Sequence, residues 1–395
     1  MSREKLVELA RNHMHHAVNG TVPLADGIAE IPVENYYDPD RWQAEMDQIF
    51  ARVPLVLGFS VEIPKSGDYK AMEVAGVPLI LVRGKDGAVR GFVNMCSHRG
   101  AQLVDDGCGR ARSFACPYHA WTYNLTGDLI AILDDKEFGE VDVSCLGLTP
   151  LNVEERVGII WGSITPGNEL HLTEFLAGYD EYLEGHGLEN CVFVGRQSIE
   201  GPNWKVAYDG YLDFYHLPIL HKDTFGPDYN NKSIFDNWGP HQRVGAPDHR
   251  LLDLVDLPEE EWTQTRLTSG VWTIFPHISI ASFDAGGHIY MISQLFPGDN
   301  PDTSITHQSF LATFSPDEQQ KDDIANIMDF LRYVVAEEDY FTGNRIQKTV
   351  KTGAKSHFYF GRNEEGGQRF HRWTDALLAA ESEEDLVLLY KKGVG

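Results

Sequence analysis

The sequence has little of what marks membrane, secreted and nucleic-acid-binding proteins. No stretch approaches the roughly 18 uncharged apolar residues that a membrane helix needs, and the N-terminal Met-Ser-Arg-Glu-Lys lacks the apolar core of a secretory signal. Basic residues are few, 33 against 59 acidic ones, and the formal net charge is −26. This deficit of Lys and Arg argues against binding to nucleic acids or to an anionic membrane surface. We therefore expect a soluble, cytoplasmic protein that binds neither.

Cysteine is also sparse, with 5 residues in a chain of 395. An odd, low count in a large cytoplasmic chain is not a disulfide framework. The sequence lacks a Gly-rich dinucleotide fingerprint, so any nicotinamide or flavin chemistry must lie in another protein. Hydrophobic residues make up 42% of the chain and aromatic residues 11%, which is enough to bury a sizeable core and to exclude a disordered chain.

The pattern of apolar and turn residues changes once along the chain. From Pro54 to about Thr165, short β runs are separated by turn residues, which predicts a small antiparallel β domain. After Pro166, the pattern predicts an α+β domain with a largely antiparallel sheet. Its expected elements include a helix over 204–216 and strands over 191–200, 271–282, 288–296 and 304–315.

Two Cys–His pairs lie at predicted strand ends, Cys96-Ser-His98 and Cys116-Pro-Tyr-His119. A structural zinc finger groups two cysteines and then two histidines, at other spacings. The order Cys-His, Cys-His instead suits a Rieske [2Fe–2S] centre, in which two thiolates bind one iron and two imidazoles bind the other. A zinc site and two unrelated Cys/His pairs are the alternatives. Cys108 has no partner at ligand spacing, and we expect it to be structural.

A second group of metal-binding residue types contains Asp209, Asp213, His216 and His221. Asp213 and His216 are i and i+3, so they share one face of the predicted helix. His216 and His221 are about 140° apart on a straight helix, but Pro218 can end or kink it and bring His221 back. Two neutral imidazoles and one carboxylate form the facial triad of non-haem Fe(II) oxygenases, which leaves positions open for O2 and substrate.

With these residues, the chain resembles the catalytic α subunit of Rieske non-haem iron aromatic-ring-hydroxylating oxygenases, over roughly residues 40–375. The resemblance implies an N-terminal helical segment over 1–40 that packs on the catalytic domain, an all-β Rieske domain over 41–165, and a catalytic domain over 166–395. The catalytic domain is expected to have an antiparallel sheet wrapped by helices, of START-like or helix-grip type. One departure from the family pattern is Ala120, where Gly is usual.

The resemblance also implies roles for individual residues. His216 and His221 would bind the mononuclear iron, and Asp213 would bridge the two metal centres. Asp209 stands where several relatives have Asn, and we expect it to take part in catalysis. The four ligands of the [2Fe–2S] cluster would be Cys96, His98, Cys116 and His119.

The third ligand of the mononuclear iron must be a carboxylate from elsewhere in the chain. A long predicted helix after Ser315 carries an apolar stripe, and Glu338 and Asp339 fall within or beside it. A carboxylate there is costly unless it is paired or bound to metal. Periodicity places Glu338 nearer the centre of the stripe. The resemblance favours Asp339, because the family's acid precedes a Gln at the spacing that separates Asp339 from Gln347. We predict Asp339 and keep Glu338 as the alternative.

The expected reaction is reductive activation of O2. Electrons from NAD(P)H would pass through a separate reductase, with or without a ferredoxin, to the cluster and then to the mononuclear iron. One or two oxygen atoms would enter an apolar small molecule, and we expect this substrate to be an aromatic hydrocarbon. Pocket walls should come from 206–225 and from the strands over 270–315.

Two other functions stay open at this point. One is oxidative demethylation or monooxygenation of a non-aromatic substrate, and the other is a non-catalytic Rieske electron carrier fused to a ligand-binding domain. The resemblance further implies a head-to-tail homotrimer or an α3β3 assembly, in which the cluster of one subunit serves the iron of the next.

Overall fold

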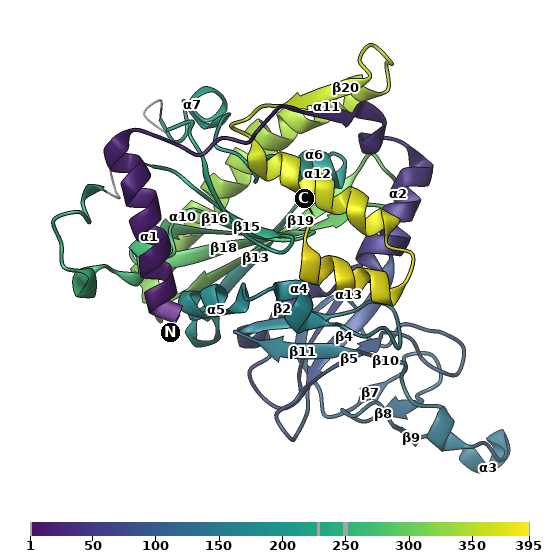
Figure 1. The fold of residues 1–395 in the computed structure, drawn as a ribbon. Coiled ribbons are helices and arrows are strands. Elements are labelled where there is room, and N and C mark those ends of the chain that lie inside the picture. The colour runs from purple at the N-terminus through teal and green to yellow at the C-terminus, as the bar shows by residue number, and fades with distance from the viewer. Residues whose placement is uncertain (1, 227–229, 248–251, 395) are drawn as a thin grey trace. The chain divides into compact units, whose positions relative to one another are not determined.

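The computed structural model describes residues 2–226, 230–247 and 252–394, and its contacts divide the chain into two compact units (Figure 1). The first unit comprises Met1–Ile49, Leu172–Gly187 and Cys191–Gly395, and the second comprises Phe50–His171 and Leu188–Asn190. The second unit thus begins and ends later than the domain predicted over 41–165. Within the described ranges, every helix is too short or too polar to cross a membrane.

The second unit is built almost entirely from short antiparallel strands. A five-stranded sheet has the order β10-β5-β4-β3-β6, and two three-stranded sheets have the orders β11-β12-β2 and β7-β8-β9. Inward-facing side chains, among them Phe92, Trp121 and Tyr123, form one core. The predicted all-β fold of this part is confirmed. The elements are β2 (Leu55–Phe59), β3 (Asp68–Val74), β4 (Val77–Arg83), β5 (Val89–Val93), β6 (Gly107–Arg110), β7 (Phe114–Ala115), β8 (Thr122–Tyr123), β9 (Leu129–Ala131), α3 (Asp135–Phe138), β10 (Pro150–Leu151), β11 (Val153–Arg156) and β12 (Ile159–Gly162).

The first unit is organised around a seven-stranded antiparallel sheet with the order β13-β19-β18-β17-β16-β15-β14. The single strand predicted over 271–282 is two strands, because the chain turns at Phe275-Pro276, where proline cannot donate a ladder hydrogen bond. Two strands, β14 and β15, were not predicted. The strands are β13 (Val192–Gly201), β14 (Ile234–Trp238), β15 (His241–Gly245), β16 (Val271–Ile274), β17 (Ile278–Asp284), β18 (His288–Pro297) and β19 (Ser304–Ala312).

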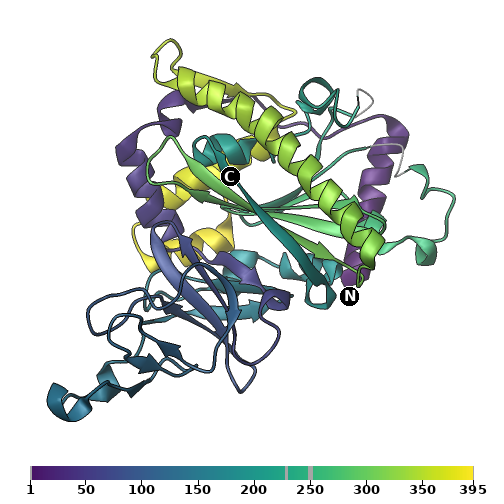
Figure 2. The ribbon, with the colours of Figure 1, turned by 180° about the vertical axis from the view of Figure 1, so that it is seen from behind.

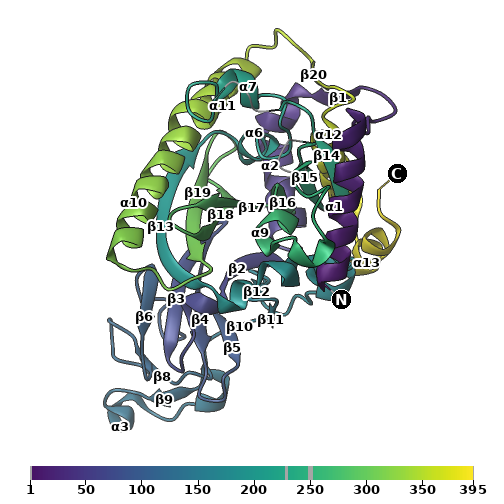
Figure 3. The same ribbon diagram turned by 90° about the vertical axis from the view of Figure 1, so that its left-hand side faces the viewer.

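Helices lie on both sides of this sheet (Figures 2 and 3). On one side, α10 (Glu318–Tyr333), the π-helical turn η8 (Val334–Asp339) and α11 (Tyr340–Val350) follow one another as a rod beside β13. On the other side lies α1 (Ser2–Asn19) (Figure 3). This arrangement confirms the predicted antiparallel sheet wrapped by helices. The remaining elements are β1 (Ala29–Pro32), α2 (Pro39–Glu45), α4 (Leu172–Leu176), α5 (Asp180–Leu183), α6 (Trp204–Asp209), α7 (Leu217–Leu220), α9 (Gln264–Leu267), β20 (His357–Phe360), α12 (Glu365–Ala379) and α13 (Glu383–Lys392).

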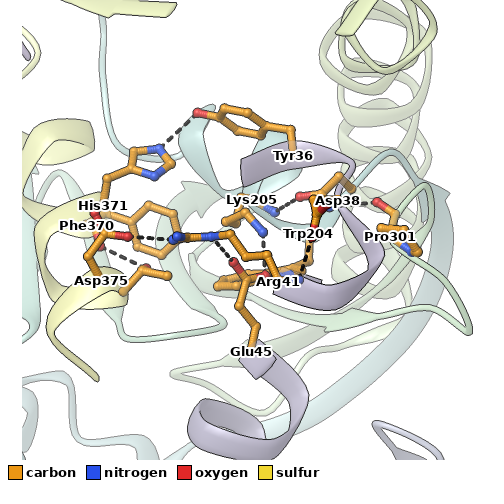
Figure 4. Close-up of polar contacts among 12 residues, drawn as sticks. Tyr36, Asp38, Arg41, Glu45, Trp204, Lys205, Pro301, Phe370, His371 and Asp375 are labelled. Atoms are coloured by element: carbon orange, nitrogen blue, oxygen red, sulfur yellow. Dashed lines mark hydrogen bonds and ion pairs between the residues drawn. The ribbon is translucent and has the colours of Figure 1, made fainter. Parts of the chain in front are cut away.

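An ion-pair network, buried at Glu45 and Lys205 and exposed at Asp375, attaches α2 to α6 and α12 (Figure 4). Glu45 is fully buried and accepts hydrogen bonds from Trp204 Nε1 at 2.9 Å and from Lys205 Nζ. Arg41 Nε also donates to Glu45, at 3.1 Å, and Arg41 Nη2 donates to Asp375 at 2.6 Å. Buried charges are tolerated only when they are paired and hydrogen-bonded. The network therefore fixes α6, the helix that leads into the second group of metal-binding residue types.

Candidate metal centres and their surroundings

The two Cys–His pairs lie on loops of the second unit. Cys96 and His98 follow β5, and Cys116 and His119 lie in the turn between β7 and β8. The ring centroids of the two histidines are 4.7 Å apart, and both cysteines are buried and free. Among the described residues, neither histidine Nδ1 atom has a hydrogen-bond partner, although both atoms are buried. Two unpartnered imidazole nitrogens and two buried thiols fit a cluster held by two Cys and two His.

Aromatic side chains shield this site. The Trp121 ring stacks on His98, with centroids 4.8 Å apart and 9° between the planes, and Phe138 contacts His98 edge-on. The Tyr123 hydroxyl accepts a hydrogen bond from Ser97 N at 3.0 Å and lies 3.2 Å from Cys96 Sγ. Burial raises the pKa of Tyr123 to about 12, so its proton is available to the sulfur. None of these aromatic residues was predicted to have a role, although Trp121 lies only two residues after His119.

The turn that follows Cys116 contains a strained residue. Ala120 has a φ of +58°, and its N–H donates to the Cys116 carbonyl at 2.9 Å. A non-glycine residue in this left-handed region costs about 1–2 kcal/mol, because Cβ approaches the following carbonyl. This is the position at which the family pattern has glycine.

Ala120→Gly is therefore expected to stabilise the second unit by about 1 kcal/mol, because glycine adopts a positive φ without strain. The free energy of unfolding of the holoprotein, measured by denaturant titration, checks this. The matched control is Ala131→Gly in β9, which has no positive φ and should lower stability by roughly 0.5–1 kcal/mol. A loss of stability in both variants would contradict the assignment of strain to Ala120.

Two histidines of the second group converge with Asp339 in the first unit. Asp339 Oδ1 lies 3.2 Å from His221 Nε2 and 3.8 Å from His216 Nε2. The candidate ligand atoms of His216, His221 and Asp339 all lie within 4.8 Å of one another. Two imidazoles and one carboxylate around one point fit the donor set of a mononuclear non-haem iron. The structure thus brings together the three residues that were predicted to bind this metal.

The local backbone differs from the expectation of one helix over 204–216. The helix α6 ends at Asp209, and Asp213 lies in the following turn. Asp213 Oδ1 accepts hydrogen bonds from the N–H groups of Tyr215 and His216, at 2.6 and 3.3 Å, and lies 3.1 Å from His216 Nδ1. Such side-chain bonds to nearby backbone compete with a helix. Pro218 lies in the first turn of α7 instead of kinking a longer helix.

The two adjacent acids of η8 flank one imidazole. Glu338 Oε2 lies 2.7 Å from His221 Nδ1 and accepts a hydrogen bond from Thr224 Oγ1 at 2.9 Å, while Asp339 faces Nε2. A π-helical turn, closed by i→i+5 bonds, holds more residues than an α turn, so adjacent side chains diverge less. Burial lowers the pKa of His221, and the hydrogen bonds and charges of Asp339 and Glu338 raise it by more. Glu338 is placed to fix the ring orientation and tautomer of His221.

Asp209 has a different set of partners. Its Oδ2 accepts a hydrogen bond from the Tyr36 hydroxyl at 2.8 Å, and its Oδ1 lies 3.2 Å from His371 Nε2. Tyr36 and His371 also contact each other, at 2.9 Å (Figure 4). Sequence analysis predicted neither partner, because residues this far apart in the chain meet only in the folded unit.

Comparison with known proteins gives two profile matches. The profile described as "Rieske [2Fe-2S] domain" matches residues 54–142, and that described as "Ring hydroxylating alpha subunit (catalytic domain)" matches residues 188–380. A solved structure of the quaternary ammonium Rieske monooxygenase CntA has a TM-score of 0.73 and 22% identity, and the match covers 93% of this chain and 96% of that chain.

Three curated relatives are similar in sequence. The carnitine monooxygenase oxygenase subunit of Escherichia coli is 28% identical over 343 residues, 84% of this chain and 86% of that protein. The salicylate 5-hydroxylase large oxygenase component of Ralstonia sp is 32% identical over 302 residues, 65% of this chain and 70% of that protein. The glycine betaine monooxygenase oxygenase subunit of Chromohalobacter salexigens is 31% identical over 243 residues, 61% of this chain and only 52% of that protein.

Proposed function

Because the chain belongs to the Rieske oxygenases, the family of oxygenase subunits with a ring-hydroxylating alpha-subunit catalytic domain, we propose that it is the terminal oxygenase component of such a system. The observation that carries this proposal is the convergence of His216, His221 and Asp339. When bound, the cluster supplies single electrons and the mononuclear iron activates O2. The proposal includes a separate NAD(P)H-dependent reductase, with or without a ferredoxin, and a ring-shaped trimer, with or without β subunits.

Each predicted site residue has a task in this proposal. Cys96, His98, Cys116 and His119 hold the cluster, and His216, His221 and Asp339 hold the mononuclear iron. Asp213 fixes the orientation of His216 at its Nδ1 atom and lies on the electron route between the centres. Glu338 fixes the orientation of His221 at its Nδ1 atom and is not a ligand. Asp209 is a positioning residue, because its contacts to Tyr36 and His371 fix the end of α6.

We propose further that the reaction is the monooxygenation of a small, non-aromatic nitrogen compound. The carnitine and glycine betaine relatives support this class. The charge around the site agrees with it: burial raises the pKa of Glu364, and the negative charges of Asp213 and Asp209 add to the rise. A negative local potential favours a cationic substrate, such as a quaternary ammonium ion, over an anion. Hydroxylation of an aromatic acid is the second candidate, because of the salicylate 5-hydroxylase relative.

The chemistry of the first candidate gives a specific product. One atom of O2 enters a C–H bond next to nitrogen, and the other leaves as water after uptake of two electrons and two protons. The resulting N–C–OH group breaks its C–N bond and releases an amine and an aldehyde. Release of an aldehyde therefore separates this reaction from the hydroxylation of an aromatic ring.

A single-turnover experiment tests the proposal without the unidentified electron-transfer partner. The holoprotein is chemically reduced, freed of reductant and mixed with isotope-labelled O2 and carnitine, glycine betaine or salicylate. We expect aldehyde in proportion to the mononuclear iron content with an ammonium compound, and the label in the oxidised carbon fragment. Labelled hydroxysalicylate instead would favour the second candidate. No labelled product from any of the three compounds would contradict the proposed substrate classes.

A further inference from the structure

A row of polar side chains crosses the inner surface of the seven-stranded sheet. The pairing of adjacent strands aligns Gln197 with Gln308, Gln308 with Ser293, and Ser293 with Ser279. The alignment continues from Ser279 to Thr273 and from Thr273 to Gln242. Six neighbouring strands thus each contribute one amide or hydroxyl group at the same level. All but Gln197 are fully buried, where apolar residues are usual.

Three donors of this polar row, the amide of Gln308 and the hydroxyls of Ser279 and Ser293, are buried without a partner among the described residues. Gln308 Oε1 accepts a hydrogen bond from Gln197 Nε2 at 2.6 Å, but the described part of the chain offers no acceptor to Gln308 Nε2. The same holds for Ser279 Oγ, whose residue is 1% exposed. A buried polar group without a partner costs about 1–3 kcal/mol. This cost is offset when a bound molecule supplies the missing hydrogen-bond acceptor.

The polar row faces the proposed mononuclear iron site. Gln197 Nε2 also donates to the Met328 carbonyl of α10, at 2.9 Å. The row therefore lies on the sheet face that is covered by the rod, and Asp339 belongs to this rod. Tyr211 connects the two directly. Burial raises the pKa of Tyr211 to about 12, the nearby Ser293 side chain opposes the rise, and the charge of Asp339 adds to it. Tyr211 therefore lies within interaction distance of both the row and a proposed iron ligand.

A second row, next to the first on the same sheet face, is apolar. It consists of Ala281, Met291 and Phe310, which are aligned with one another. Each lies two positions along its strand from a member of the polar row, namely Ser279, Ser293 and Gln308 respectively. Met291 and Phe310 pack in a cluster that includes Phe225 and Phe330, and the Phe225 ring lies 5.4 Å from His221. The sheet face is thus divided into a polar and an apolar band, both next to the iron site.

We infer that the polar row binds a hydrogen-bond-accepting oxygen of the substrate, a carbonyl or carboxylate, while the apolar band holds the carbon end at the iron. The free donors are the amide of Gln308 and the hydroxyls of Ser279 and Ser293, and all three require an acceptor. The inference rests on the proposed function, since it concerns the same site. It changes the substrate class from the apolar molecule expected from the sequence to a small amphipathic one.

The test compares three probes that share one carbon skeleton. They are γ-trimethylaminobutyrate, its primary amide, and butyltrimethylammonium, which lacks the oxygen. With wild-type holoprotein and an NADH-driven reductase, KM should be roughly tenfold or more lower for the two oxygen-bearing probes, as expected for one or two hydrogen bonds. Ser279→Ala and Gln308→Glu, which turns a donor into an acceptor, should each reduce this preference without lowering kcat in proportion. Equal KM values for all three probes would overturn the inference.

The control is Ser309→Ala, because Ser309 is adjacent in sequence but points to the other face, where its Oγ accepts a hydrogen bond from Arg196 Nε at 3.0 Å. It should leave the probe preference unchanged. Thermal melting of the substrate-free holoprotein gives a second readout that does not need turnover. Ser279→Ala should melt at the wild-type temperature or above, since it removes an unpartnered group. A marked fall would show that the row is structural and overturn the inference. If salicylate alone is turned over, the proposed substrate class is wrong. The inference about the row then stands if Ser279→Ala raises KM for salicylate more than for phenol, and is overturned if both KM values change equally.

Discussion

Asp339→Ala is expected to lower turnover by roughly three orders of magnitude or more. Without the carboxylate, only two imidazoles remain to hold the mononuclear iron, and the iron is lost from the site. The variant should keep the visible absorption of the cluster, and its iron content should fall from about three to about two per chain. Metal analysis, acid-labile sulfide and single-turnover product yield measure the three effects. The cluster remains intact because its ligands come from a separate unit of the chain.

The other acids of η8 are the controls for this experiment. Glu338→Gln keeps an acceptor at His221 Nδ1 and should retain iron with an affinity lower by roughly 10–100-fold. Glu337 is exposed on the same turn, and Glu337→Ala should behave as wild type. If Glu338→Gln lost the iron while Asp339→Ala retained it, the third ligand would be Glu338. Stoichiometric zinc without acid-labile sulfide in the wild type would exclude the Rieske assignment.

Mixing two inactive variants should restore activity to roughly a quarter of wild type, on the assumption of closed three-subunit rings. His119→Ala lacks a working cluster, and His216→Ala lacks the mononuclear iron. If the cluster of one subunit serves the iron of the next, every mixed ring has one junction where an intact cluster meets an intact iron site. Random mixing makes about three quarters of the rings mixed, each with one working site in three.

Two affinity tags and co-expression supply the mixed rings. Product formation is measured in the unseparated mixture, where roughly a quarter of wild-type activity is expected, and after purification over both tags, where only mixed rings remain and roughly a third is expected. Each variant alone should stay at background, which controls for contamination by wild type. Electron transfer within one chain predicts no recovery in any mixture. Inactive rings that carry both tags and the expected metal content would therefore rule out the route between subunits.

Sequence patterns predicted the fold class and singled out the Cys–His pairs and the histidines of the candidate sites, because both depend on local signals. Alternating apolar residues indicated the strands, and the two Cys–His pairs are short motifs. Glu338 and Asp339 show the limit of prediction from local patterns. The prediction assumed an α-helical period throughout, whereas η8 is a π-helical turn, and both acids reach His221. No sequence period reveals such a turn, because π-helical turns occur as single turns inside α-helices and have no repeat of their own.

The polar row was missed for a different reason. Gln197, Ser279 and Gln308 lie on three strands and are aligned only by the register of the sheet. Read along one strand, each is a single polar residue and indicates nothing more than an exposed position. The expectation of an apolar substrate came instead from the resemblance to ring-hydroxylating oxygenases. Tyr36 and His371, which contact Asp209, were likewise beyond the reach of any local pattern.

The order of the two units along the chain has a consequence for biosynthesis. Residues 1–49 belong to the first unit, but most of that unit lies after residue 171, with the second unit between. During translation, Glu45 emerges long before Lys205 and Trp204, which pair with it in the folded protein. The second unit is contiguous except for Leu188–Asn190 and can fold as it leaves the ribosome. Residues 1–49 are thus made before the second unit but reach their native place after it, and they must stay soluble until then.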